Sequence, residues 1–271
     1  MNIQTNPSKR NHPNDDSPLV MPFPSAPALS EAGFLPALPR NLEQIILTPH
    51  PPKPLLVSDL PPIPSTALAR GVTDFAASNL PKPTFNHSMR VYHLGLAIRE
   101  QHLPQATFSA EVYYMLSLLH DLGTTLADTA MSFEFSGAIK ARETLLVLGA
   151  DEVFADSVAE AIIRHQDVYD GAADGGQGET LTALTAVVQF ATLLDNTGKF
   201  AGLVHSGTMD DVVAKWPREG WTGCFCRVIR DEGERKPWCH TTTIGIERFQ
   251  ELVKGNEVAS KYEVEMAERV V

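Results

Sequence analysis

The sequence lacks three features that would assign the protein to a broad class at once. Only three cysteines occur in 271 residues, and such a low, odd number is not typical of a secreted disulfide framework. No uninterrupted apolar run approaches the roughly 20 residues needed to span a bilayer. The formal net charge is −11 at pH 7, whereas a general nucleic-acid binder needs a basic face. We therefore expect a cytoplasmic protein that binds neither membrane nor nucleic acid.

The prolines are unevenly distributed and divide the chain. Fifteen of the twenty lie before residue 65, and this density excludes regular helix because proline lacks the N–H donor and disfavours helix at the preceding residue. We predict a Pro-rich, largely irregular N-terminal arm over residues 1–64. Within it, residues 1–40 are expected to be disordered and residues 41–64 extended, with a short helix at Asn41–Leu47. Residues 65–271 then form one domain of ordinary size.

That domain has the periodicity of helices and no convincing alternation of period two. Gly123 is well placed to end one helix in a left-handed turn, and the glycine-rich segment 171–178 is expected to be a flexible loop. The predicted fold is all-α, a compact helical bundle. Capping residues, prolines and glycines place its helices at Ser65–Asn79, Asn86–Gln101, Phe108–Asp121, Ser132–Leu148, Asp151–Asp167, Thr180–Asn196 and Thr241–Lys254.

Four side chains suited to metal binding interrupt apolar segments. His120 and Asp121 close the apolar run Val112–Leu119, His87 lies upstream, and Asp195 lies on the inward face of a later helix. Burying one such group without a partner costs several kcal/mol, about 2–7, and a shared ion offsets that cost for all four. Ordinary helix capping explains any one of them, but the set favours a divalent ion such as Zn²⁺, with Fe²⁺ as the alternative.

The order His, then His-Asp, then a distant Asp resembles the HD-domain metal-dependent hydrolase superfamily. Longer strings resemble one branch of it, the fungal cyanamide hydratase (urea hydro-lyase) family. The resemblance covers about residues 70–250 and implies an HD-type helical bundle. Its strings are Asn86–Tyr92, Leu118–Thr125, Ser132–Phe135, Ile163–Asp167, Leu194–Gly198 and, more weakly, Lys236–Thr242.

The resemblance implies one zinc ion, ligated by His87, His120, Asp121 and Asp195, with a position open for water. It also implies a lyase that hydrates cyanamide, or a related small nitrile-type substrate, to urea. A bound metal can bring the pKa of water from 15.7 toward 7, so that metal-bound hydroxide attacks the C≡N carbon and the nitrogen then gains a proton. The implied partner is a small molecule, and assembly into a homo-oligomer stays open.

Three residues are candidates for the chemical step. His165 lies on an apolar helix face and is the first choice for proton transfer or substrate orientation; a core histidine or a ligand of a second metal is the alternative. Glu134, between two phenylalanines, is either a general acid–base or a first-turn charge that complements the helix dipole. Asp121 is a candidate both as ligand and as catalytic group.

Polar residues beside these positions are candidates for substrate binding. For each of them a purely structural role remains open, as an ion pair, a cap, a turn or a solvated lysine. They are Arg90, Asn86, Thr124, Thr125, Asn196 and Lys199.

Two other functions remain open. An HD phosphohydrolase that acts on nucleotides would need cations near the metal, and Arg90, Arg142 and Arg164 are the candidates. A helical interaction module with a structural metal would use the proline-rich arm to dock on a partner.

Overall fold

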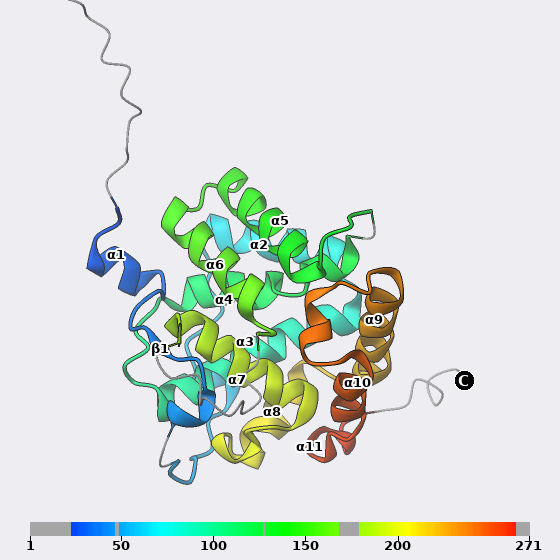
Figure 1. Cartoon of the computed structure of the whole chain (residues 1–271). Helices are drawn as coiled ribbons and strands as arrows, with labels where there is room; N and C mark the ends of the chain where they lie inside the picture. The colour runs from blue at the N-terminus through cyan, green and yellow to red at the C-terminus, as the bar shows by residue number, and fades with distance from the viewer. Residues whose placement is uncertain (1–22, 47–48, 127, 168–178, 264–271) are drawn as a thin grey trace, which may run out of the picture.

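The computed structural model describes residues 23–46, 49–126, 128–167 and 179–263 (Figure 1). Helices dominate these residues, so the predicted all-α class is confirmed. The α-helices are α1 (Ala26–Glu31), α2 (Ala67–Asn79), α3 (Lys82–His102), α4 (Ala110–Leu119), α5 (Phe133–Val147), α6 (Glu152–Arg164), α7 (Ala183–Thr197), α8 (Ser206–Lys215), α9 (Trp221–Arg235), α10 (Ile246–Lys254) and α11 (Glu257–Ser260). The 3₁₀ turns are η1 (Leu42–Gln44), η2 (Val57–Asp59), η3 (Leu122–Thr125), η4 (Ala201–Leu203) and η5 (His240–Thr243).

Helices α3, α4 and α7 form the centre of the bundle, as Figure 1 shows. Nearly every residue of α4 and α7 is buried, which is expected for helices that are apolar on all faces. The side chains of Ser109 and Thr182 cap the two helices by accepting backbone N–H groups. Gly198, with φ 73°, ends α7 in the left-handed conformation that glycine adopts at low cost.

The other helices cover this centre in pairs. Helices α5 and α6 pack on each other; α6 also packs on α4 and α7, and α5 packs on η3. Helices α9 and α10 pack on each other, and α9 also packs on α3 and α10 on α7. The α9–α10 pair has a small apolar cluster of its own, which includes Phe133, Trp221, Phe225 and Phe249. This cluster closes one side of the bundle next to the polar residues described below.

The predicted helices are confirmed with shifted ends, and some helices were not predicted. Helix α3 begins four residues early, because Pro83 fits in a first helical turn, where its missing N–H is not needed. The segment 241–254 divides into η5 and α10. Helices α8, α9 and α11 were missed. In α9 the buried side is narrow, with Trp221, Phe225 and Ile229 spaced four apart between exposed polar and charged residues.

The prediction of disorder is wrong for residues 23–40. Helix α1 is capped by Ser25 and carries Pro27 in its first turn, where proline is tolerated. Strand β1 (Leu38–Pro39) pairs antiparallel with β2 (Thr180–Leu181). Pairing with a strand far along the chain and burial of a few apolar side chains therefore order this part of the arm despite its prolines. Residues 1–22 and the predicted loop 171–178 lie outside the described residues.

Residues 41–64 follow the prediction more closely. The predicted helix at Asn41–Leu47 is present only as the single turn η1, capped by Asn41. Leu42 and Leu60 are buried against the bundle. Within the described ranges, no helix is both long and apolar enough to cross a membrane.

Gly123 does not have the left-handed conformation that was predicted, because it lies inside η3. Its lack of a side chain serves a close approach instead. A Cβ added there would overlap the backbone carbonyl of Phe133, at the start of α5. Gly123 therefore allows η3, which follows His120 and Asp121 directly, to pack against α5.

We predict that Gly123→Ala lowers the free energy of unfolding by about 1–3 kcal/mol or more, because the added methyl group meets backbone that cannot rotate away. Gly223→Ala is the matched control. It lies in α9 with no atom within 4 Å of the added Cβ, so helix propensity should stabilise it by about 0.5–1 kcal/mol. Chemical denaturation of both variants measures the difference, and equal effects would contradict the packing argument.

Candidate active site

Two histidines end helices in the same way and present the same ring atom. His120 follows α4 and His165 follows α6. Each Nδ1 lies against the backbone carbonyl three residues earlier, at 2.8 Å from Ser117 O and 2.7 Å from Ile162 O. A carbonyl only accepts, so each Nδ1 carries the proton. The Nε2 atom of each neutral ring is then left with a lone pair.

His87, from α3, has its Nδ1 fixed by a carboxylate. That atom lies 2.6 Å from Oδ2 of Asp195, so it too is the protonated nitrogen. The Nε2 atoms of His87 and His120 face each other at 3.2 Å. Asp121 Oδ2 lies 3.7 Å from the first and 3.4 Å from the second. The two imidazole nitrogens therefore converge with no proton to share between them, and the Asp121 carboxyl group lies beside them.

Burial keeps both histidines in the neutral form that binds a cation, whereas it disfavours the charged form of Asp121, which a bound cation would stabilise. It lowers the pKa of both His87 and His120 to about 4, and it raises the pKa of Asp121. Within the described ranges, both carboxylate oxygens of Asp121 and Nε2 of His165 are buried without a hydrogen-bond partner. Such groups cost about 2–7 kcal/mol each in an apolar interior. Their number indicates that a ligand belongs there.

The donor set fits a divalent metal ion. One ligand atom each from His87, His120 and Asp121 lies within 4.8 Å of the others. Two imidazoles and a carboxylate suit Zn²⁺ or Fe²⁺ and leave coordination positions open. The group lies just beyond the end of α4, where neighbouring residues about 100° apart around a helix can still reach one point.

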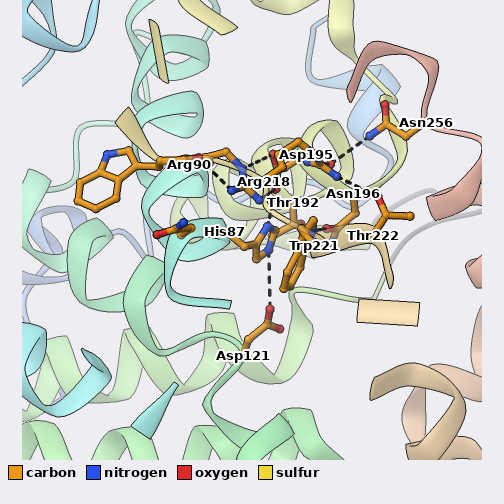
Figure 2. Close-up of polar contacts among 12 residues, drawn as sticks. His87, Arg90, Asp121, Thr192, Asp195, Asn196, Arg218, Trp221, Thr222 and Asn256 are labelled. Carbon is orange, nitrogen blue, oxygen red and sulfur yellow. Dashed lines mark hydrogen bonds and ion pairs between the residues drawn. The ribbon is translucent and has the colours of Figure 1, made fainter. Parts of the chain in front are cut away.

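Asp195 was predicted as the fourth ligand, and the structure does not bring it into this group. It lies on the opposite side of the His87 ring, as Figure 2 shows. Arg90 donates to both of its carboxylate oxygens at 2.9 Å, and Arg218 donates to Oδ1 at 2.9 Å. Burial alone would raise the pKa of Asp195, but the charges of the two arginines and the His87 hydrogen bond hold it well below its ordinary value. In this geometry Asp195 orients His87, as carboxylates behind metal-binding histidines commonly do.

Residues outside the predicted set complete this network. Arg218, fully buried just before α9, also donates to the backbone carbonyl of Asp195 at 2.8 Å and to Glu263 at 2.9 Å. Asn256 donates to the same carbonyl at 3.0 Å. Sequence reasoning missed these residues because they belong to segments without a predicted helix, and no local pattern links them to Asp195.

A small cavity adjoins the metal-binding group. The space open to the centre of a water-sized molecule is about 10 Å³, which corresponds to roughly one such molecule. His120, Asp121 and His165 line one part of it. Gln166 and Asn196 add polar groups, and Leu193, Ile244 and Phe249 add apolar ones. His165 Nε2 lies 3.7 Å from Asp121 Oδ1, so the predicted catalytic histidine is brought to the group.

Glu134 is fully buried but does not line the cavity. Its Oε1 lies 3.2 Å from the Thr241 hydroxyl, which in turn lies 3.3 Å from Oε1 of Gln166. The other oxygen, Oε2, has no hydrogen-bond partner in the described part of the chain. A polar path of two side chains thus separates this carboxyl group from the cavity.

Of the predicted substrate-binding residues, Asn196 lines the cavity and the others take the structural roles that had been left open. Arg90 pairs with Asp195 rather than with Asp121. The remaining contacts are Asn86 Nδ2 to Pro217 O at 2.9 Å, Thr124 Oγ1 to Asp121 O at 2.7 Å, Thr125 Oγ1 to Leu122 O at 2.8 Å, and exposed Lys199 to Glu43 at 3.5 Å.

The fold and the donor group together define an HD-domain protein, and residues 84–198 match the family described as HD domain. Two curated relatives in Saccharomyces cerevisiae are cyanamide hydratase DDI2 and cyanamide hydratase DDI3. Each is 39% identical to this chain over 221 residues, which cover 80% of this chain and 93% of the relative. The chain therefore belongs to the HD-domain cyanamide hydratase family, and the predicted resemblance is confirmed.

We predict that Asp121 and Asp195 differ in their effect on metal affinity. Asp121→Asn removes one of three convergent donors and should abolish stable metal binding. Asp195→Asn should weaken binding by only about 10–100-fold, because it releases the orientation of His87. Competition with a chelator measures both affinities. Asp151→Asn, at the exposed N-cap of α6, is the control. Equal, complete loss in both variants would restore Asp195 as a direct ligand.

Proposed function

We propose that this chain is a lyase that hydrates cyanamide, or a related small nitrile-type substrate, to urea with one bound divalent metal ion. Zn²⁺ is the first choice and Fe²⁺ the second. One observation carries the proposal: a small cavity adjoins three convergent metal-binding side chains, and the two imidazole nitrogens among them are unprotonated. The family relationship supports it, because both yeast relatives are named cyanamide hydratases.

His87, His120 and Asp121 would hold the ion, which would supply Lewis acidity and lower the pKa of water toward 7. The side chains of the protein supply the rest. His165 Nε2 is unprotonated, since burial lowers the pKa of this histidine. It is free to take a proton from the attacking water and to pass it to the nitrile nitrogen, a role typical of histidine.

Other polar groups would orient the substrate. Asn196 and Gln166 line the cavity together with apolar residues and would offer amide groups to a small polar molecule. Glu134 would act through Thr241 and Gln166 rather than on the substrate itself. Because cyanamide has few atoms, binding energy from remote groups is scarce, and accurate orientation near the reacting atoms matters more.

The phosphohydrolase alternative is not favoured, because the three candidate cations are engaged elsewhere. Arg90 is bound to Asp195. Arg142 pairs with Glu152 at 2.8 Å and Asp156 at 2.5 Å. Arg164 pairs with Asp167 at 3.3 Å. None of the three lines the cavity.

The interaction-module alternative is not favoured either. The described part of the arm buries Leu38, Leu42 and Leu60 within this chain. Those side chains are therefore unavailable to a partner. A cytoplasmic location and a homo-oligomeric state stay predictions.

The function is tested by elemental analysis of the purified protein together with a urea-release assay on added cyanamide. We expect one equivalent of metal and urea formation that stops when a chelator removes the ion. His165→Ala should retain the metal and lose about 10²–10⁴-fold in kcat. His102→Ala is the control, since this ring stacks on His50 away from the cavity. Chelator-resistant urea formation, or phosphate release from nucleotides instead, would refute the proposal.

A further inference from the structure

Trp221 contacts both parts of the site, although it does not line the cavity. It is the first residue of α9, follows Gly220 in the left-handed conformation (φ 79°), and is only 1% exposed. Its ring stacks on His87, with centroids 4.1 Å apart and planes 11° apart, and on Phe225 at 4.9 Å and 18°. The His87 and Phe225 rings are themselves 6.3 Å apart, so the three rings form one cluster, and this packing restricts the plane of the indole.

That N–H group fixes the side-chain amide of Asn196. Trp221 Nε1 lies 2.9 Å from Oδ1 of Asn196. An indole nitrogen only donates, so the amide atom facing it must be the oxygen. The two possible orientations of the asparagine amide, which exchange its oxygen and nitrogen, are thereby distinguished. The opposite end, Nδ2 with its two N–H donors, is directed away from the indole, and Asn196 is one of the residues that line the cavity.

Residues at and just before the start of α9 contact two adjacent residues near the end of α7. Arg218 binds the carbonyl and carboxylate of Asp195, and Trp221 binds the side chain of Asn196 (Figure 2). The same segment therefore orients the residue behind the metal-binding His87 and a residue of the cavity wall. Figure 2 shows the Trp221 side chain beside His87, with Asn196 close to it.

A donor in this place complements the rest of the cavity. Asp121 offers acceptor oxygens, and the neutral rings of His120 and His165 each offer an unprotonated nitrogen. When water adds to a C≡N carbon, the electron pair of the broken π bond moves to nitrogen, which becomes a better acceptor. A preorganised donor aimed at developing negative charge is typically worth 10²–10³ in kcat.

We propose that Trp221 is a positioning residue that fixes the Asn196 amide so that its N–H₂ group donates to the substrate's nitrile nitrogen. This inference rests on the proposed function for its substrate class. Its structural part, the coupling of Trp221 to Asn196, does not depend on the substrate.

The test compares Trp221→Phe with Asn196→Ala and with the double variant, all loaded with metal. A phenyl ring keeps the stacking on His87 but has no N–H, so metal content should equal that of the wild type. We expect Trp221→Phe to lower kcat by about 10–100-fold, as misorientation of a reacting pair does. Asn196→Ala should lower it at least as much. The double variant should match Asn196→Ala alone, because the tryptophan acts only through the amide.

A second variant avoids any change at the aromatic stack. In Asn196→Asp one carboxylate oxygen still accepts from the indole, while the other replaces the N–H₂ donor with an acceptor. We expect metal content to be retained and turnover to be lost by about 10²-fold or more. Trp238→Phe is the matched control: it removes an indole N–H that donates to the carbonyl of Ala130 at 2.9 Å, away from the cavity, and it should keep kcat near the wild-type value.

One readout is independent of activity. The Trp221 indole N–H resonance should be protected from hydrogen exchange in the wild type and in Asn196→Asp, and lose protection in Asn196→Ala. Wild-type turnover in Trp221→Phe, loss of metal in that variant, or additive effects in the double variant would overturn the inference. If the wild type forms no urea, the proposed function fails, whereas the exchange experiment still decides whether the indole and the amide are coupled.

Discussion

The site depends on where three imidazole protons are. His120 and His165 each donate Nδ1–H to a carbonyl of their own helix end, and His87 donates to Asp195. Each contact fixes a tautomer, and all three leave an unprotonated Nε2. With the Asp121 carboxyl group among them, this part of the interior is rich in lone pairs, and the three imidazoles have no proton to share there. A bound cation would satisfy such an arrangement. The arrangement itself results from two helix-end hydrogen bonds and from the hydrogen bond between His87 and Asp195.

The carboxylate of Asp195, which lies behind His87, is buried, and its negative charge must be balanced by positive charge. Two buried guanidinium groups surround one carboxylate at Asp195, and Glu263 supplies a second negative charge to Arg218. Breaking a buried pair by removing one partner is strongly destabilising, because the other charge is left uncompensated. Arg218 and Glu263 lie outside the segment 84–198 that matches the HD domain. The orientation of a histidine inside that segment therefore depends on the C-terminal part of the chain.

The fold class and most of the central helices could be predicted from the sequence, because buried helices have long apolar runs with clear caps. His87, His120 and Asp121 could also be predicted as metal-binding candidates, because they stand out as polar groups in such runs. Helical periodicity correctly turned Asp195 inward. It carries no information about which side of the His87 ring that carboxylate reaches, since this depends on the packing of α3 against α7. Trp221 was missed although its four-residue spacing with Phe225 and Ile229 was a usable sign of a helix. For Arg218, in a turn, no such sign existed.

The size of the cavity and the charge of the site constrain the chemistry together. The cavity has space for about one water-sized molecule next to the donor group, and the arginines that would bind phosphate are neutralised within the fold. What remains is a short, polar substrate with an acceptor atom, next to unprotonated nitrogens and a carboxylate. For such a molecule, discrimination by bulk is weak and discrimination by hydrogen bonding is strong, because a mismatched analogue leaves buried polar groups unpaired. Under the proposed function, substrate choice would be set by the direction of a few amide and imidazole groups. Residues of α9 and its preceding turn hold two of them, the Asn196 amide directly and the His87 ring through Asp195.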